Sequence, residues 1–248
     1  MKTIGRVITS AIFLVLTGLM IAAAKAAPSA VFAFYPAFSR WALSAISSVT
    51  GLVPVALWEV LAGLLALWFF YTLIRVFTKR RSLLRWLSGV LLGVSAGVFF
   101  FVGLWGLNHY DVGAAEKLGL SVREYSVQEL TDATRFYADQ LNALAGSVAR
   151  DADGCAALDD FAALAARAGD GYTALGERYA LFSGGTARVK KLAAWPLYSR
   201  FGTTGIYVCL TAEASVNPDT YAAWLPFTMC HEQAHGKGVA AEDGANFC

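Results

Sequence analysis

The chain has 248 residues, of which 57% are hydrophobic and 15% charged, and its mean hydropathy is +0.51. Soluble domains carry about 25% charged residues, so this composition excludes an ordinary soluble globular protein. The net charge of +2 hides a split, because residues 1–110 hold nine of the 20 Lys and Arg residues but only one of the 18 acids. A basic apolar part followed by a mildly acidic part is not typical of nucleic-acid binding, and we expect no nucleic-acid partner.

The basic part contains three apolar segments, at about 7–24, 54–77 and 86–107. A helix needs about 20 mainly apolar residues to cross a bilayer core. The first and third segments carry no charge, and the middle one has only Glu59 and Arg75, each near an end. We therefore predict a membrane domain over residues 1–110 with the lipid bilayer as partner, although the middle segment could instead be a buried core helix.

The orientation follows from the basic residues that flank these segments. A short loop with Lys79, Arg80, Arg81 and Arg85 joins the second and third segments, and Lys2 and Arg6 precede the first. Short basic loops stay in the cytoplasm, so we predict that residues 111–248 form an extracytoplasmic domain. The first segment could be a cleaved signal peptide, but its apolar run of 18 residues is long for one, which favours an uncleaved anchor.

Between and after the spans, several residues are expected at the membrane surface. Residues 28–53 contain aromatic side chains and a single Arg40, which is typical of an interfacial helix. Glu59 lies one turn inside the second span, where it could contact the outer domain or simply lie near the interface. His109 follows the third span and is expected at headgroup level rather than as a metal ligand.

The outer part is predicted to be α+β. Ser126 and Glu129 form a capping box for a helix over 126–148, whose apolar stripe we expect to pack in the core. Further helices are expected over 155–168, 172–180 and 220–236, and a β-branched and aromatic run predicts a strand over 203–210. Four cysteines lie in this part (Cys155, Cys209, Cys230 and Cys248), with no metal-binding spacing, and their pairing cannot be read from sequence.

The most informative motif is His231-Glu232-Gln233-Ala234-His235. Positions i and i+4 share one face of a helix, so His231 and His235 can bind one metal ion, for which we predict Zn²⁺. Glu232 can then act as a general base on a water molecule. The alternative is a polar helix end with two incidental histidines.

Catalytic zinc takes three protein ligands, so a third must be found. Gly238 can end the motif helix in a left-handed turn and bring the following residues back over it. We favour Glu242 as the third ligand, with Asp243 or a residue elsewhere as alternatives. Cys230 is expected to be apolar filler, because a neighbouring helix position points about 100° away from His231.

The motif and the residues after it resemble the DUF3810 family of bacterial membrane proteins. The resemblance extends to Trp105-Gly106-Leu107-Asn108, Gly205-Ile206-Tyr207, Thr211-Ala212-Glu213-Ala214 and Leu225-Pro226-Phe227-Thr228. It covers most of the chain. It implies a multi-pass protein of the bacterial inner membrane with a zincin-like outer domain, similar to zinc metallopeptidases.

Glu242 and Asn246 are also similar to the E-x-x-x-D segment of gluzincin-type membrane peptidases. That likeness implies that Glu242 is the zinc ligand and that Asn246 orients a histidine. Two features depart from it: Gly244 stands where an acid is expected, and the chain ends inside this segment. We therefore expect a C-terminally truncated helix that holds Glu242 loosely.

These features predict a membrane-anchored zinc metallopeptidase that hydrolyses a peptide or protein substrate. The segment from Gly205 to Leu210 resembles the edge strand of zinc peptidases, which implies that it pairs with an extended substrate. Glu213 is expected to line the cleft, and Tyr207 or Arg200 to donate to the oxyanion. The alternative is a non-catalytic membrane protein with a structural or degenerate zinc site, in which Cys230 or Glu213 would be the fourth ligand. A transporter is a poorer third possibility, because the spans lack buried polar pairs.

Overall fold

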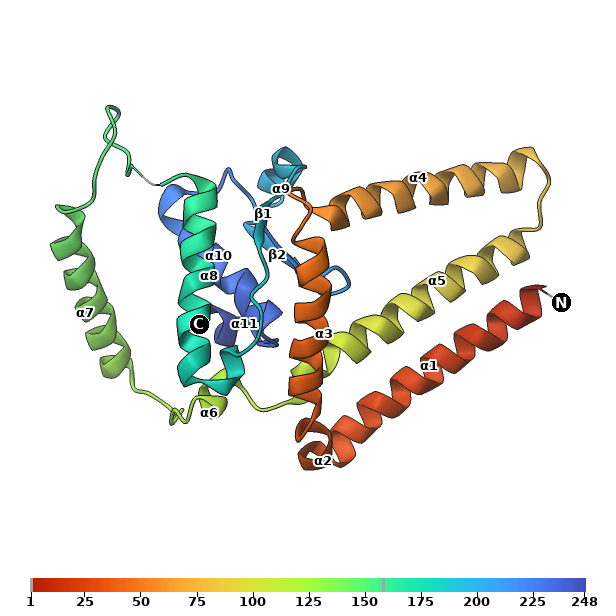
Figure 1. Ribbon diagram of the computed structural model, residues 1–248, viewed down its shortest axis with the longest axis horizontal. Helices are drawn as coiled ribbons and strands as arrows, with labels where there is room; N and C mark the ends of the chain where they lie inside the picture. Colours follow the sequence, from red (N-terminus) through yellow and green to blue (C-terminus); the bar gives the residue numbers. More distant parts are fainter. Residues whose placement is uncertain (1, 158) are drawn as a thin grey trace.

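The computed structural model describes residues 2–157 and 159–248. Three long helices run away from a smaller α/β part in the same general direction (Figure 1), namely α1 (Lys2–Ala26), α4 (Leu57–Thr78) and α5 (Leu83–Leu104). All three are long and apolar enough to cross a membrane, as the sequence predicts. α5 begins earlier than predicted because the Ser82 side chain caps it by accepting from the Arg85 N–H.

The three helices are not equally packed. α1 and α5 lie together along their length, where small side chains such as Ser10 and Ser95 are buried and the rings of Phe13 and Phe99 are 5.1 Å apart. α4 diverges from them and meets α5 mainly near the α4–α5 loop, where the Trp86 indole donates to the Thr72 hydroxyl over 3.0 Å. Their outer faces expose Leu, Val, Ile and Phe side chains, as expected of helices surrounded by lipid.

Two helices join α1 to α4: α2 (Pro28–Phe32) and α3 (Tyr35–Thr50). α3 runs across the ends of the long helices (Figure 1). One of its faces is buried, since Leu43 packs with Cys209 and Ala212, whereas the side chain of Trp41 is 68% exposed. This amphipathic crosswise helix fits the interfacial helix that the sequence predicts.

The sheet has three short strands in the order β1-β3-β2: β1 (Val189–Lys191), β2 (Gly205–Val208) and β3 (Glu213–Val216). β3 pairs in parallel with β1 and antiparallel with β2, with Tyr207 opposite Ala214. The predicted strand over 203–210 corresponds to β2, which is shorter. The central strand β3 was not predicted, because its sequence includes Glu213 and Ser215 and lacks the run of β-branched and aromatic residues that is typical of a buried strand.

Two helices cover one face of the sheet: α8 (Phe161–Arg178) and α10 (Leu225–Gly236). Leu164 and Ala168 of α8 and Met229 of α10 form a buried cluster with β-strand side chains such as Val216. The two helices predicted over 155–168 and 172–180 are in fact one, which begins where the Asp160 carboxylate caps it. The smaller elements are η1 (Gly106–Tyr110), α6 (Ala114–Lys117), η2 (Ala180–Phe182), α9 (Trp195–Arg200), η3 (Ala222–Trp224) and α11 (Glu242–Phe247).

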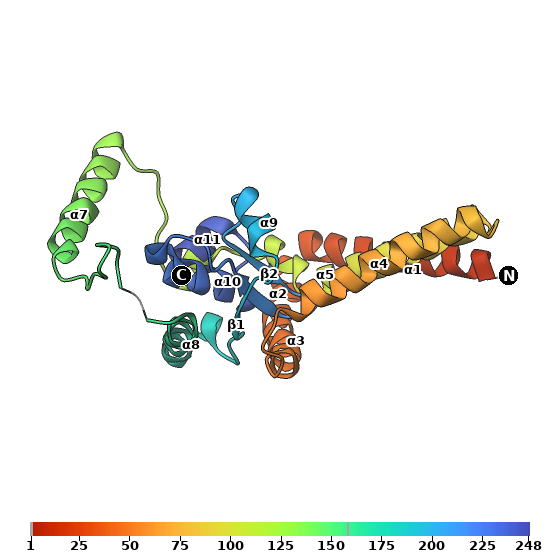
Figure 2. The same cartoon turned by 90° about the horizontal axis from the view of Figure 1, so that it is seen from above.

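Helix α7 (Val127–Ala145) stands apart from the rest in both views (Figures 1 and 2). Its predicted capping box is present, with Ser126 and Glu129 bonded reciprocally. The prediction that its apolar stripe packs in the core is wrong, because Tyr137 and Leu141 are 66% and 69% exposed. The cap and the helical period are local properties, whereas a partner for the stripe depends on contacts that the pattern does not specify.

Candidate metal centre

The motif residues lie on α10, which begins with Pro226 in its first turn, where a missing N–H is tolerated. The helix ends at a left-handed turn, since Gly238 has φ +87° and the Val239 N–H donates to Ala234 O over 3.1 Å. This turn was predicted from the glycine, and it leads the chain back to α11. The structure thus places Glu242 beside the two histidines.

The candidate ligand atoms lie close together. The Nε2 atoms of His231 and His235 are 3.1 Å apart, and the two carboxylate oxygens of Glu242 lie 3.2 Å from His231 Nε2 and 3.5 Å from His235 Nε2. A tetrahedral zinc ion with bonds of about 2.0–2.1 Å holds neighbouring ligand atoms about 3.3 Å apart. The spacing and the His₂Glu donor set therefore fit one zinc ion. Asp243 instead accepts from the Gly244 N–H over 2.8 Å, which favours Glu242 among the predicted candidates.

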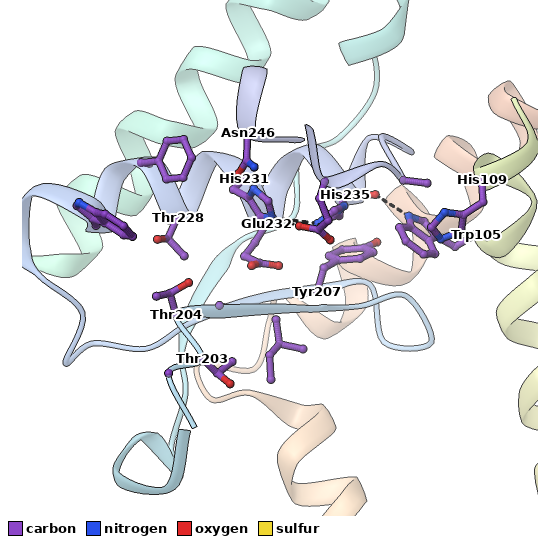
Figure 3. A pocket seen from close by; sticks show the side chains of 17 residues that line it. Trp105, His109, Thr203, Thr204, Tyr207, Thr228, His231, Glu232, His235 and Asn246 are labelled. Carbon is purple, nitrogen blue, oxygen red and sulfur yellow. Dashed lines mark hydrogen bonds and ion pairs between the residues drawn. The ribbon is translucent and has the colours of Figure 1, made fainter. Parts of the chain in front are cut away.

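His235 is held in the tautomer that a metal requires. Its Nδ1 lies 2.7 Å from Val239 O, and because a carbonyl only accepts, the proton is on Nδ1 and the Nε2 lone pair is free. Burial, the largest cause, lowers the pKa of His235 and keeps the ring neutral. The Trp105 indole N–H donates to His235 O over 2.8 Å and ties this helix end to the end of α5 (Figure 3).

His231 is less constrained. Its Nδ1 is buried and has no hydrogen-bond partner among the described residues. Asn246 lies beside the His231 ring (Figure 3), but within the described chain its amide makes no hydrogen bond to either histidine. The predicted orienting role of Asn246 stays a prediction.

Glu232 points from α10 towards β2 and is 5% exposed. Burial first, and then the negative charge of Glu242, raise the pKa of Glu232 to about 8. Gly205 makes this position possible, because a Cβ there would lie 2.5 Å from Glu232 Oε1 and 2.7 Å from its Cγ. A glycine inside a predicted strand often marks a position where another group approaches the backbone closely, so Gly205 could have indicated this contact from the sequence.

These residues line a cleft of about 630 Å³. Its walls come from the end of α5, the segment leading into β2, η3 and α10 (Figure 3). Sequence reasoning missed Trp105, Trp224 and Phe227 as lining residues, and it placed His109 at the membrane surface. In the structure the His109 ring also lines the cleft and stands edge-on to Trp105, with centroids 5.1 Å apart.

The two proposed oxyanion donors differ in position. Tyr207 lines the cleft, and its hydroxyl is buried with no partner among the residues described. Burial raises the pKa of Tyr207, so the hydroxyl keeps its proton and remains a donor. Arg200 is the last residue of α9, is exposed and is not among the lining residues of the cleft.

The prediction that Glu213 lines the cleft is wrong. Its carboxylate is 1% exposed, forms an ion pair with Lys190 and accepts from the Leu57 and Trp58 N–H groups over 2.9 and 2.8 Å. It therefore caps the first turn of α4 and joins the sheet to a candidate membrane helix. The sequence could not reveal this, because its partners are 23 to 156 residues away.

Glu59 makes a second connection of the same kind. Its carboxylate accepts from the Ala193 and Ala194 N–H groups over 2.7 and 3.0 Å. Of its two predicted roles, the structure shows a contact with the α/β part of the chain. Cys230 packs between two apolar clusters, as predicted for a filler residue, and all four cysteines are free in the part of the chain described.

The fold and the site define a helical protein with three helices suited to a membrane and a small α/β domain that carries a candidate His₂Glu metal centre. The family described as "Protein of unknown function (DUF3810)" matches residues 34–248, so the chain belongs to that family. No curated protein and no solved structure matches the chain.

Proposed function

We propose that this protein is a membrane-anchored zinc metallopeptidase. The observation that carries the proposal is the arrangement of His231, His235 and Glu242 at tetrahedral spacing, with the Glu232 carboxylate beside them in a cleft. Bound zinc supplies a Lewis acid that polarises a peptide carbonyl and acidifies a coordinated water. The known ligand set of peptidases with this motif is two histidines and a glutamate.

Two residues of the chain carry out the remaining steps of the proposed reaction. Glu232 takes a proton from the attacking water and passes it to the leaving amine. With its pKa at about 8 the carboxyl is largely protonated at neutral pH, and a cation held by the neighbouring His231, His235 and Glu242 would lower that pKa and favour the carboxylate that a general base needs. The Tyr207 hydroxyl donates a hydrogen bond to the developing oxyanion.

The strand β2 aligns the substrate. It pairs with β3 on one side only, so its other edge offers backbone groups to an extended peptide over the cleft. Trp105 and His109, directly after α5, form one end of the cleft. We infer that the substrate is a peptide segment close to the membrane surface.

The topology is part of the proposal. Arg6 and Arg85 lie together at one end of the long helices, where the Arg6 guanidinium donates to Arg85 O over 3.1 Å, and the metal centre lies at the other end (Figure 1). The positive-inside rule then places the basic end in the cytoplasm of a bacterial cell and the metal centre outside it. Cys155 is exposed and is first replaced by serine. In that background, cysteines introduced at Lys79 and Tyr221 should react with an impermeant thiol reagent only at Tyr221 in intact cells.

The alternative is a closed structural site. It requires a fourth protein ligand, but Cys230 packs in apolar clusters and Glu213 caps α4. In the described residues only His231, His235 and Glu242 come together as a possible ligand group. An open position on the metal favours catalysis over a structural role.

The test is elemental analysis of purified protein, with His231→Ala and Glu232→Gln beside wild type. We expect about one zinc per chain in wild type and in Glu232→Gln, and none in His231→Ala. Peptide hydrolysis should be lost in both variants. A folded wild type without zinc refutes the proposal, and zinc-loaded wild type that cleaves no peptide in a broad library favours the non-catalytic alternative.

A further inference from the structure

A second cavity lies at the end of the long helices far from the metal centre. It has a volume of about 250 Å³ and is bounded by the start of α1, the last turns of α4 and the first turns of α5. Its lining combines four arginines with two tryptophans: Arg6, Arg75, Arg81, Arg85, Trp68 and Trp86.

The four arginines have no acidic partner. None of the ion pairs among the described residues involves them, and Glu59, the single acid of residues 1–110, lies in the first turn of α4, at the opposite end of that helix. Arg6 donates to Arg85 O over 3.1 Å and Arg75 to the Tyr71 hydroxyl over 3.0 Å. A guanidinium has five N–H donors, so most of this donor capacity remains available to an anion.

The packing also positions these groups. The Arg6 guanidinium lies against α5 at Gly89, where an added Cβ would be in van der Waals contact with Arg6 Nη1 at 3.4 Å. The Trp86 indole is fixed by its bond to Thr72, and its ring lies 5.0 Å from that of Phe69. Trp68, Val76 and Val90 give the cavity an apolar wall below the charged rim.

We propose that this cavity binds the phosphate group of an anionic phospholipid, with the acyl chains against the apolar wall between α4 and α5. An arginine guanidinium can donate two parallel hydrogen bonds to phosphate oxygens, and basic pockets between membrane helices bind anionic lipid headgroups. A soluble phosphate ester offers the same oxygens but has no chain for the apolar wall. The positive-inside rule explains the number of basic residues here but not their convergence on one cavity.

The test compares two double variants of the full chain in neutral detergent. Arg81→Gln with Arg85→Gln removes two exposed charges that line the cavity, and Lys79→Gln with Arg80→Gln removes two charges from the same loop that do not. Binding of phosphatidylglycerol, phosphatidylcholine and glycerol 3-phosphate is measured by native mass spectrometry and by titration. Thermal unfolding without lipid shows that all forms are folded.

We expect wild type to retain phosphatidylglycerol in preference to phosphatidylcholine. The cavity variant should bind it about tenfold or more weakly, at roughly 1 kcal/mol for each basic group near the headgroup, and the loop variant should match wild type. Equal losses of lipid binding in the two variants would show that the lipid is attracted by the overall positive charge, and this result would refute the proposed site. Glycerol 3-phosphate that binds as tightly as the lipid, or displaces it, would overturn the lipid as ligand.

Discussion

Gly205→Ala tests the contact between β2 and the proposed general base. The added Cβ would lie 2.5, 2.7 and 2.9 Å from Oε1, Cγ and Cδ of Glu232, so something must move. Movement of a flexible side chain is easy at a surface, but Glu232 is 5% exposed and packed beneath the strand. The carboxylate must therefore leave its place or push β2 away from α10.

The magnitude follows from the two effects. Overpacking of a buried contact costs about 1–3 kcal/mol of stability. Displacement of a positioned general base costs about 10²–10⁴-fold in rate. The three atoms nearest to the added Cβ all belong to Glu232 and not to a proposed ligand, so zinc content should remain near that of wild type.

The assay combines elemental zinc, thermal unfolding in detergent and kcat/KM on a cleaved peptide. Gly171→Ala is the matched control, because Gly171 is exposed in α8 and nothing lies within 4 Å of its added Cβ. That change should leave activity unaltered and should not lower stability, since alanine favours a helix by about 1 kcal/mol. Wild-type stability and hydrolysis in Gly205→Ala would refute the contact, and loss of zinc there would show that β2 supports the ligands as well.

Three further predictions concern the contacts that hold the site. Glu213→Gln leaves Lys190 buried without its partner and should lower the free energy of unfolding by about 3–5 kcal/mol. Adding Lys190→Met to the same chain should recover part of this loss, and thermal unfolding measures both changes. Burial raises the pKa of Glu213, but Lys190 and the α4 N–H groups outweigh this and hold it below its ordinary value of 4.5. Its contribution should therefore be complete above pH 4.5 and fall as the pH drops below that, and Glu213→Gln should flatten this acid limb of the stability curve. Trp105→Phe removes the bond to His235 O and should weaken zinc binding by about 10–100-fold in chelator competition, with unfolding of the metal-free protein as control.

The sequence predicted the parts of this structure that depend on local pattern. Uncharged runs of about 20 residues specify the long helices, and the i, i+4 spacing brings His231 and His235 to one face. Gly238 predicted the turn that returns Glu242 to them, and Ser126 predicted a helix start. Each of these follows from residues that are close together in the chain, within one apolar run or within one or two helical turns.

The larger features that sequence reasoning missed are very short strands and contacts between residues far apart in the chain. Strands of three or four residues, such as β1 and β3, are too short to show a period of two. Glu213 has the composition of a surface acid, and only the fold brings Lys190 and the start of α4 to it. The stripe on α7 has the pattern of a core helix, yet Tyr137 and Leu141 remain exposed, because amphipathicity shows that a face is apolar and not what covers it.

The non-local contacts explain why the candidate metal centre has a fixed place relative to the long helices. Trp105, directly after α5, bonds to the end of α10 at His235, while Glu213 and Glu59 join the sheet region to the first turn of α4. The cleft therefore lies between two attachments to different helices. A hinge motion between the two parts would have to break the hydrogen bonds of the Glu213 and Glu59 carboxylates, and a hydrogen bond to a charged group contributes more than a neutral one. The position of the cleft relative to the ends of α4 and α5 is thus set by the fold, and under the proposed function a substrate would have to bring its peptide bond to that position.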